Sequence, residues 1–188
     1  MHELSTARLQ LRGWRAEDLA PFAALNADPE VMAFMPAPLS RADSDAFAAA
    51  CQGQLERDGF GLWAVGVRGA ASFIGYVGMK APSFTAAFTP CIEIGWRLAR
   101  ASWGCGYATE AARACLEHAF TRLALPEVVS FTVPANARSR AVMQRLGMTE
   151  DAPAAFEHPR LPPGHPLRHH LLYRLSQARW AATRSAGD

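Results

Sequence analysis

The chain has 188 residues, of which half are hydrophobic and 19% are charged, and its formal net charge is +2. This length fits one domain with a sizeable core, and the small net charge argues against nucleic acid or an anionic membrane as a partner. No apolar run is long enough to cross a bilayer and the first residues lack a signal-peptide core, so we expect a cytoplasmic protein. The four cysteines form no C-x-x-C pair, which argues against zinc-knuckle and thioredoxin-type sites.

The first 80 residues predict a strand, a pair of helices and a β-hairpin. Thr6–Trp14 alternates apolar and polar side chains, as a strand does. Apolar residues then recur with helical spacing at Asp18–Asn26 and at Arg41–Arg57. Two further strand patterns are joined by a short glycine-containing connection, which predicts an antiparallel hairpin between Gly61–Val67 and Ser72–Met79.

The second half begins, after a loop, with a strand at Cys91–Leu98. A glycine-bearing turn then leads into an amphipathic helix that ends near Leu123, and Val128–Val133 follows as a strand buried on both faces. The remaining elements are a short helix, an irregular or strand-like segment and a final strand, at Asn136–Leu146, Met148–Phe156 and Arg168–Leu175. We expect a single domain over residues 1–180 and a disordered tail over residues 181–188.

This order of elements predicts an α/β protein with a mixed sheet and helices on both faces. The strand Cys91–Leu98, the helix and the strand Val128–Val133 form a crossover, which makes the two strands parallel near the middle of the sheet. The turn Trp103–Ala108 of this crossover can hold phosphate, because the first turn of a helix leaves its amides free and glycine lets a ligand approach the backbone. We therefore predict that it cradles the diphosphate of a cofactor.

Further segments accompany this loop along the chain. The opening strand contains Arg-Leu-Gln-Leu-Arg at residues 8–12, Glu-Ile-Gly-Trp at 93–96 precedes Trp-Gly-Cys-Gly-Tyr-Ala-Thr-Glu-Ala at 103–111, and Asn-Ala-Arg-Ser at 136–139 precedes Gln-Arg-Leu-Gly-Met at 144–148. Together they resemble the GNAT superfamily of acyl-CoA-dependent N-acyltransferases. Within it, the resemblance is greatest to the branch that contains the ribosomal-protein-alanine acetyltransferases.

The resemblance implies the GNAT fold, a central mixed but mostly antiparallel sheet that splays between its fourth and fifth strands, with helices on both faces. It implies acetyl-CoA (coenzyme A) as the cofactor, with the diphosphate on the backbone amides of Trp103, Gly104, Cys105, Gly106, Tyr107 and Ala108. The pantetheine arm would bind the backbone of Trp96 and Leu98 like an added strand. It would also contact residues near the next helix, namely Asn136, Ser139 and Met143.

Two positions depart from the family pattern. Ala101 stands where the loop often begins with Gln or Arg, although Arg100 is adjacent and can compensate. Met143 stands where many members carry a tyrosine that protonates the leaving thiolate. The resembling branch also commonly lacks that tyrosine, and the resemblance gives its role to Ser139. The alternative for Ser139 is an ordinary cap in the first turn of its helix, beside Asn136.

Attack of an amine on a thioester needs a base, because a primary amine is mostly protonated at neutral pH. Glu93 is the first candidate, since the resemblance puts a base there and a carboxylate on an apolar strand is expected to have a raised pKa. The alternative is a structural carboxylate that pairs with an arginine such as Arg97.

A proline-rich segment near the C-terminus carries four histidines between residues 158 and 170. Their spacing matches no zinc pattern, so we expect no metal. The family often shapes its acceptor pocket with this segment, so His158 or His165 could orient the substrate or act as the base instead of Glu93. Glu157 is a further carboxylate there that could bind a cationic amine. The alternative is a rigid loop whose histidines contact only solvent and backbone. Phe34 would line the same pocket, unless it packs between the N-terminal helices.

The sequence thus predicts an N-acetyltransferase that moves an acetyl group from acetyl-CoA to a primary amine by direct attack in a ternary complex. The acceptor would be a protein N-terminus or a small-molecule amine. The alternative is a non-catalytic CoA-binding or partner-binding domain on the same fold, which the missing tyrosine would allow. We expect neither nucleic acid nor a membrane as a partner, and a monomer or homodimer.

Overall fold

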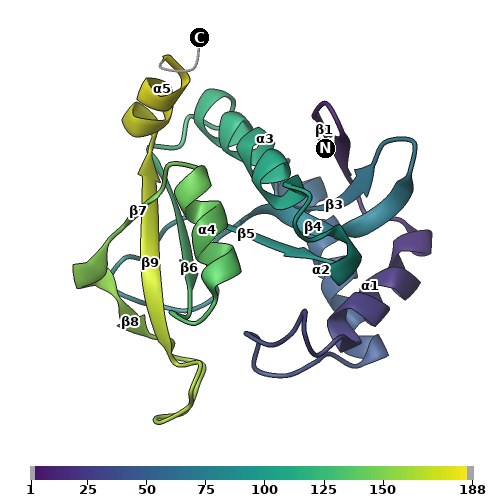
Figure 1. The fold of residues 1–188 in the computed structure, drawn as a ribbon, viewed down its shortest axis with the longest axis horizontal. Helices are drawn as coiled ribbons and strands as arrows, with labels where there is room; N and C mark the ends of the chain where they lie inside the picture. The colour runs from purple at the N-terminus through teal and green to yellow at the C-terminus, as the bar shows by residue number, and fades with distance from the viewer. Residues whose placement is uncertain (1–2, 186–188) are drawn as a thin grey trace. The chain divides into compact units, whose positions relative to one another are not determined.

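A computed structural model describes residues 3–185 of the chain (Figure 1). The chain divides into two compact units. The first comprises the chain up to Lys80 together with Gly95–Cys115, and the second comprises Ala81–Ile94 and the chain from Leu116 onward. Strand β5 (Glu93–Leu98) and helix α3 (Tyr107–Thr121) each contribute residues to both units.

The first unit is built on strands in the order β1-β2-β3-β4-β5. The first four strands pair antiparallel, and their bounds are β1 Leu4–Ser5, β2 Leu9–Arg12, β3 Leu62–Val67 and β4 Ala71–Lys80. The hairpin predicted from the sequence is therefore confirmed. It carries a bulge between Val65 and Val67, which the alternation of side chains did not indicate.

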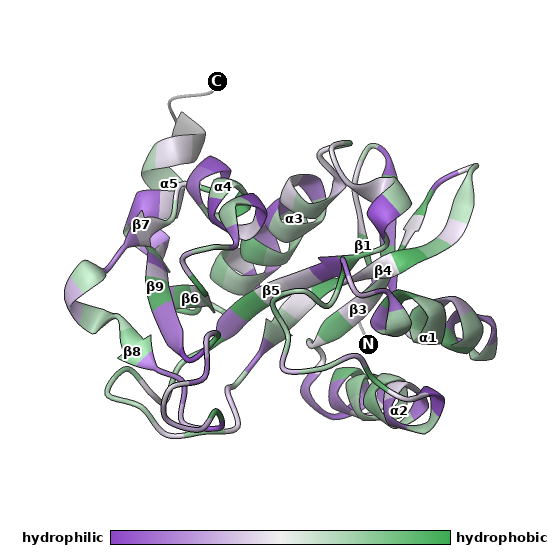
Figure 2. Cartoon of the chain, turned by 60° about the horizontal axis from the view of Figure 1, so that its bottom comes forward, coloured by the Kyte–Doolittle hydropathy of each residue, from purple (hydrophilic) through white to green (hydrophobic). Residues whose placement is uncertain are grey.

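Two helices cover one face of this sheet, α1 (Leu19–Ala27) and α2 (Arg41–Asp58). Their apolar residues form the core of the unit with the strands, and its buried members are Phe22, Leu25, Ala48, Cys51, Leu62 and Tyr76. The rings of Trp14 and Phe22 lie 4.7 Å apart in this core. The part of α3 that belongs to this unit lies on the other face (Figure 2), so the predicted cover of helices on both faces is confirmed.

A buried ion pair fixes the end of β2. Arg12 donates to both carboxylate oxygens of Asp18 at 2.6 and 2.8 Å, and both side chains are at most 3% exposed. The guanidinium also donates to the carbonyl oxygens of Gly13 and Ser72, at 2.9 and 2.7 Å. Strand alternation predicts Arg12 on a polar face, but these bonds hold it inside the protein, where a charge needs such partners.

The second unit is built on β6 (Glu127–Thr132), which pairs in parallel with β5 and antiparallel with β9 (His169–Ser176). Strands β7 (Thr149–Glu150) and β8 (Phe156–Glu157) both pair with β9. The predicted crossover is confirmed by the parallel pair. Its register joins Glu93 to Val129 alone within the described part of the chain, and this short ladder agrees with the predicted splay of the two strands.

Helix α4 (Ala137–Arg145) follows β6 in this unit, and α5 (Gln177–Ser185) follows β9. The predicted disordered tail over residues 181–188 is wrong up to Ser185, where the chain is helical, and residues 186–188 lie outside the described part. Burial explains the helix, because the Trp180 side chain is only 9% exposed and its ring lies 5.9 Å from that of Phe120. No helix in the described range is long and apolar enough to cross a membrane.

Candidate active site

The glycine loop of the first unit has the geometry expected of a phosphate cradle. Gly104 and Gly106 have φ values of 75° and 80°, a left-handed conformation that favours glycine. A Cβ at Gly104 would meet no atom within 4 Å, so the backbone is open to a ligand there. Helix α3 makes its first intrahelical bond from the Glu110 amide to the Gly106 carbonyl at 3.0 Å. The amides at positions 107–109 precede this bond and belong to the turn that leaves its donors unsatisfied by the helix.

Arg8 braces the loop from β2. Its Nη1 donates to the Cys105 carbonyl at 3.0 Å, its Nε and Nη2 contact Glu110 Oε2 at 2.7 and 2.6 Å, and its guanidinium lies 4.8 Å from the centre of the Tyr107 ring. Burial disfavours the charged carboxylate, but hydrogen bonds from Thr6 and Arg8 outweigh this and lower the pKa of Glu110. The sequence places both Arg8 and Glu110 in family-like segments, but their contact emerges only in the fold.

Arg100 does not provide the compensation expected for Ala101. Both residues lie in a 3-10 turn, Arg100–Ser102, before the loop. The Arg100 guanidinium pairs with Glu30 and lies 3.9 Å from Asp28, both beyond the end of α1. The Arg8 side chain, in contrast to that of Arg100, contacts the loop backbone at Cys105. The side chain of Trp103 also holds the loop, because its indole donates to the Leu98 carbonyl at 2.9 Å.

Two predicted pantetheine contacts lie on β5 in this unit, with Trp96 half-buried and Leu98 buried. Gly75 of β4 has φ 135° and lies so close to this strand that a Cβ would come 2.2 Å from the Arg97 carbonyl oxygen. The Arg97 side chain donates to Asn26 Oδ1 at 2.6 Å. Phe34 is half-buried in the turns between α1 and α2, and its place in an acceptor pocket stays a prediction.

In the second unit, the strand register decides which residues share a face of the sheet. Side chains of paired residues project to the same side and alternate along each strand. Glu93 pairs with Val129, which pairs with Arg174, and Phe131 pairs with Leu172. This register places the half-buried side chain of Glu93 on the same face of the sheet as Phe131. Further along β9 on this face is His170, which pairs with Phe156 of β8.

The opposite face carries α4. Asn136 caps this helix by accepting a bond from the Ser139 amide at 3.2 Å, and its own amide donates to Thr132 Oγ1 at 3.0 Å. The backbone of Ser139 thus takes part in the predicted cap, and its half-buried hydroxyl is a separate group. Met143 is 1% exposed and belongs to the core, so its predicted cofactor contact rests on the family resemblance alone.

A ring cluster covers part of the Glu93 face. Its centroids lie 4.7–6.4 Å from their neighbours, for example 4.7 Å between Phe84 and His158 and 4.8 Å between Phe88 and Phe156. We use the name ring cluster for six half-buried residues, Phe84, Phe88, Phe131, Phe156, His158 and His170. Its phenylalanines and His170 were not singled out from the sequence, because residues from four separate segments meet only through the strand register and loops.

The candidate histidines differ in whether Nδ1 accepts a hydrogen bond from the backbone or donates one to it. Nδ1 of His158 accepts a bond from the Arg160 amide at 3.3 Å, and Nδ1 of His165 accepts from the Leu167 amide at 3.1 Å, so in each neutral ring Nε2 carries the hydrogen. Nδ1 of His170 faces the Arg168 carbonyl at 3.1 Å and must donate, which leaves Nε2 as an acceptor. Burial, the main cause, lowers the pKa of His170 and favours this neutral form.

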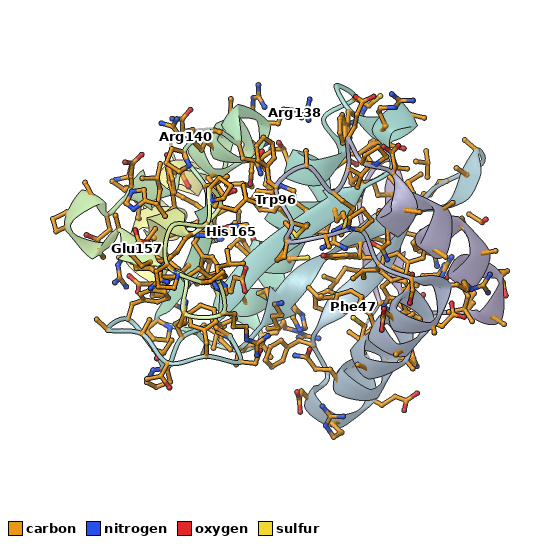
Figure 3. All side chains as sticks on the ribbon, turned by 90° about the horizontal axis from the view of Figure 1, so that it is seen from below. Phe47, Trp96, Arg138, Arg140, Glu157 and His165 are labelled. Carbon is orange, nitrogen blue, oxygen red and sulfur yellow. The ribbon has the colours of Figure 1, made fainter. Side chains whose placement is uncertain are left out.

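Glu157 is exposed and already paired. Its carboxylate lies 3.0 Å from Arg168 Nε and 3.2 Å from His169 Nδ1. Glu157 neighbours Phe156 on β8 and therefore projects to the other side of the sheet from the ring cluster. Figure 3 shows Glu157 and His165 in this unit, with Arg138 and Arg140 on α4. The structure thus does not bring Glu157 together with Glu93.

Within residues 3–185, few side chains are placed for metal binding or thiol chemistry. No group of three His, Cys, Asp or Glu side chains there could hold a metal ion. All four cysteines are free, and Cys105 in the glycine loop is exposed. Burial raises the pKa of the Cys51 thiol to about 12, which keeps it protonated.

Comparison with known proteins found a matching protein family, related sequences and similar solved structures. The family described as Acetyltransferase (GNAT) domain matches residues 8–149. The FsC-acetyl coenzyme A-N(2)-transacetylase of Aspergillus fumigatus (strain ATCC MYA-4609 / CBS 101355 / FGSC A1100 / Af293) is 33% identical over 86% of this chain and 71% of its own. The uncharacterized protein YkkB of Bacillus subtilis (strain 168) is 30% identical over 78% of this chain and 84% of its own. A solved acetyltransferase from Agrobacterium tumefaciens str. C58 has a TM-score of 0.75 and 30% identity, covering 93% of this chain and 94% of its own.

Proposed function

Since this chain belongs to the GNAT acetyltransferase family and is an acetyl-CoA-dependent N-acetyltransferase, we propose that Trp103–Ala108 binds the diphosphate of acetyl-CoA. The observation that carries this is the left-handed Gly104, with open space where a side chain would stand, at the start of α3. Amides of a first helical turn fit an anion there. Arg8 fits the same anion, because it adds positive charge while it holds the Cys105 carbonyl.

In the first unit, the backbone of Trp96 and Leu98 binds the pantetheine arm. An arm of amides and methylenes can add to an exposed strand as an extra strand does. Within the described residues, β5 and β6 share a single pair in register, Glu93 with Val129. Strand backbone beyond such a pair needs other partners, which supports this role for β5.

Glu93 acts as the base for the acceptor. Its position supports this role, because it is a half-buried carboxylate at the start of β5, in the parallel pair with Val129. Glu93 takes a proton from the ammonium group, directly or through water, and the neutral amine then attacks. Bound acetyl-CoA supplies the thioester carbonyl that the amine attacks. As the new C–N bond forms and the C–S bond breaks, the Ser139 hydroxyl donates a hydrogen bond to the departing thiolate. The proton that the nitrogen loses when the amide forms passes to that sulfur, which leaves as the thiol.

The acceptor is a primary amine, either a small molecule or a protein N-terminus. The name of the Aspergillus relative, an N(2)-transacetylase, supports nitrogen as the acceptor atom. The segments at residues 8–12, 103–111 and 144–148 support a place near the ribosomal-protein-alanine acetyltransferases. The family assignment favours an enzyme over the non-catalytic alternative considered from the sequence.

The decisive experiment mixes the protein with acetyl-CoA and a panel of primary amines and follows free thiol. We expect thiol release that depends on the amine and a product acetylated on nitrogen, as identified by mass spectrometry. Binding of acetyl-CoA without release above the rate of hydrolysis for any amine or N-terminal peptide would contradict the proposed reaction. Binding is measured separately by calorimetry, so that a failure to bind and a failure to react are distinct results.

A further inference from the structure

The ring cluster of the second unit differs from the core of the same unit in exposure. Large core side chains are fully buried, such as Leu172 at 0%, Tyr173 at 1% and Phe120 at 3%. All six members of the ring cluster are only half-buried. Folding alone would favour complete burial of four phenylalanine rings, since burial of each removes a large apolar surface from water. Six adjoining rings that all stay partly open form a contiguous apolar surface of the kind that can bind a ligand.

The segments that carry the rings are joined to each other. Nη2 of Arg160 donates to the carbonyl and to the hydroxyl of Ser83, at 2.8 and 2.6 Å. These bonds connect the loop that bears Phe84 to the loop that bears His158. The rings are thereby held in place before a ligand arrives, which reduces the entropy that binding must overcome.

The charge of the surface limits the ligand that it suits. None of the six ring-cluster residues carries a carboxylate. On the same face Glu127 is paired with Arg174, and the nearby Glu157 projects to the other face, where Arg168 and His169 already engage it. A polycation such as a polyamine needs carboxylates as partners. One polar group suits a ligand, namely Nε2 of His170. Because Nδ1 of this ring donates to the Arg168 carbonyl, Nε2 is an acceptor in the neutral ring.

Building on the proposed function, we propose that the ring cluster binds the aromatic or other bulky apolar body of a monoamine acceptor. Nε2 of His170 accepts one hydrogen bond from an N–H or O–H group carried on that body. Glu93 projects to the same face of the sheet as Phe131 and His170, so an acceptor held by its body on the rings extends its amine along the face that carries the base. The ring cluster thus determines specificity, and His170 is a positioning residue.

The first test compares acceptors that share a primary amine and differ in the body attached to it. We expect kcat/KM for phenethylamine to exceed that for n-propylamine by at least about tenfold, and spermidine to be no better than n-propylamine. Equal or higher values for n-propylamine or spermidine would overturn the inference and leave acetyl transfer established. If no amine reacts, calorimetry with phenethylamine and the CoA-saturated protein still tests the surface, and absence of binding would overturn the inference.

Ring variants locate the effect. Phe131→Leu and Phe156→Leu keep an apolar side chain, and each should raise the KM for phenethylamine several-fold while the KM for acetyl-CoA stays unchanged. Phe73→Leu is the matched control, because Phe73 is also half-buried and contacts the rings of Trp14 and Phe22 in the first unit. A similar change in the control, or an equal change for n-propylamine, would show that the rings serve stability alone.

His170→Phe tests the polar group with a readout that a packing role would not change. The titratable and charged groups around His170 are the neighbouring His158, His169, Glu157 and Arg168. A protonated His170 would repel an ammonium group and lose its acceptor. Tyramine carries a phenol O–H on its ring that can donate to Nε2. The ratio of kcat/KM for tyramine between the wild type and His170→Phe should therefore fall as the pH drops below the usual histidine range. A ratio that stays constant with pH would overturn the role of His170.

Discussion

The glycine loop of the first unit and the ring cluster of the second unit are built in opposite ways. In the loop, backbone amides and two left-handed glycines form the proposed diphosphate site, and Arg8 holds the backbone in place and adds positive charge. In the ring cluster, the backbone is tied into strands and loops, and side chains provide the whole surface. A backbone site persists through most substitutions, whereas a side-chain site changes with each one. This difference lets one fold keep its donor while its acceptor changes.

The largest effect is expected at Glu93, because its proposed role is chemical. Glu93→Gln should lower kcat by roughly 10²–10⁴-fold and leave the affinity for CoA unchanged. Glu127→Gln is the matched control, since Glu127 projects to the same face and pairs with Arg174 at 2.6 Å. Initial rates and calorimetry measure both quantities. Near wild-type turnover in Glu93→Gln would remove Glu93 from the mechanism.

The loop can be tested by adding a single methyl group. Gly104→Ala should raise the KM for acetyl-CoA by about tenfold, because the new Cβ stands where the diphosphate approaches. Gly69→Ala is the control, since Gly69 has φ 70° and equally open surroundings in the hairpin turn. Both variants should lose about 1–2 kcal/mol of stability from the left-handed conformation. The same KM for acetyl-CoA in both would mean that the loop does not contact the donor.

The brace between Arg8 and Glu110 should have a smaller effect. Glu110→Gln should raise the KM for acetyl-CoA a few-fold, because Arg8 loses the partner that positions it against Cys105. The lowered pKa of Glu110 stabilises the fold at neutral pH, and this stabilisation is lost as the pH falls through the lowered pKa. Thermal unfolding of wild type and variant should therefore converge in acid. A stability difference that persists unchanged below that pKa would contradict the ionic brace.

The smallest effect is expected at Ser139. Ser139→Ala removes the hydroxyl but keeps the backbone amide that Asn136 caps, so kcat should fall a few-fold without loss of stability. Asn136→Ala provides the contrast and should cost about 1 kcal/mol of stability through the lost cap. Chemical denaturation and initial rates separate the two roles. An unchanged kcat in Ser139→Ala would leave Ser139 with the structural role only.

Much of the fold follows from local patterns in the sequence. Periodicity predicts the hairpin, the crossover and the helices, and the spacing of Gly104 and Gly106 before an amphipathic helix predicts the loop. Arg12 shows where such patterns stop, because strand alternation gives its direction but not the buried Asp18 that it meets. Trp180 shows the same limit, since a short C-terminal segment becomes helical through burial against Phe120.

The acceptor side could not be predicted to the same degree. Phe84 and Phe88 lie in a loop without periodicity, and only the fold brings them to Phe131 and Phe156. The histidines were visible in the sequence, but which nitrogen each one offers depends on a backbone group two residues away. The proposed donor site rests on local geometry that a short motif encodes, whereas the proposed acceptor site rests on contacts between distant segments.

The division of labour between the two regions can be tested in one set of initial-rate measurements. Acetyl-CoA and phenethylamine are each varied at saturating levels of the other, for the wild type, Gly104→Ala and Phe131→Leu. We predict that Gly104→Ala raises only the KM for acetyl-CoA and that Phe131→Leu raises only the KM for the amine. Variants that raise both constants by the same factor would contradict the separation of a backbone donor site from a side-chain acceptor site.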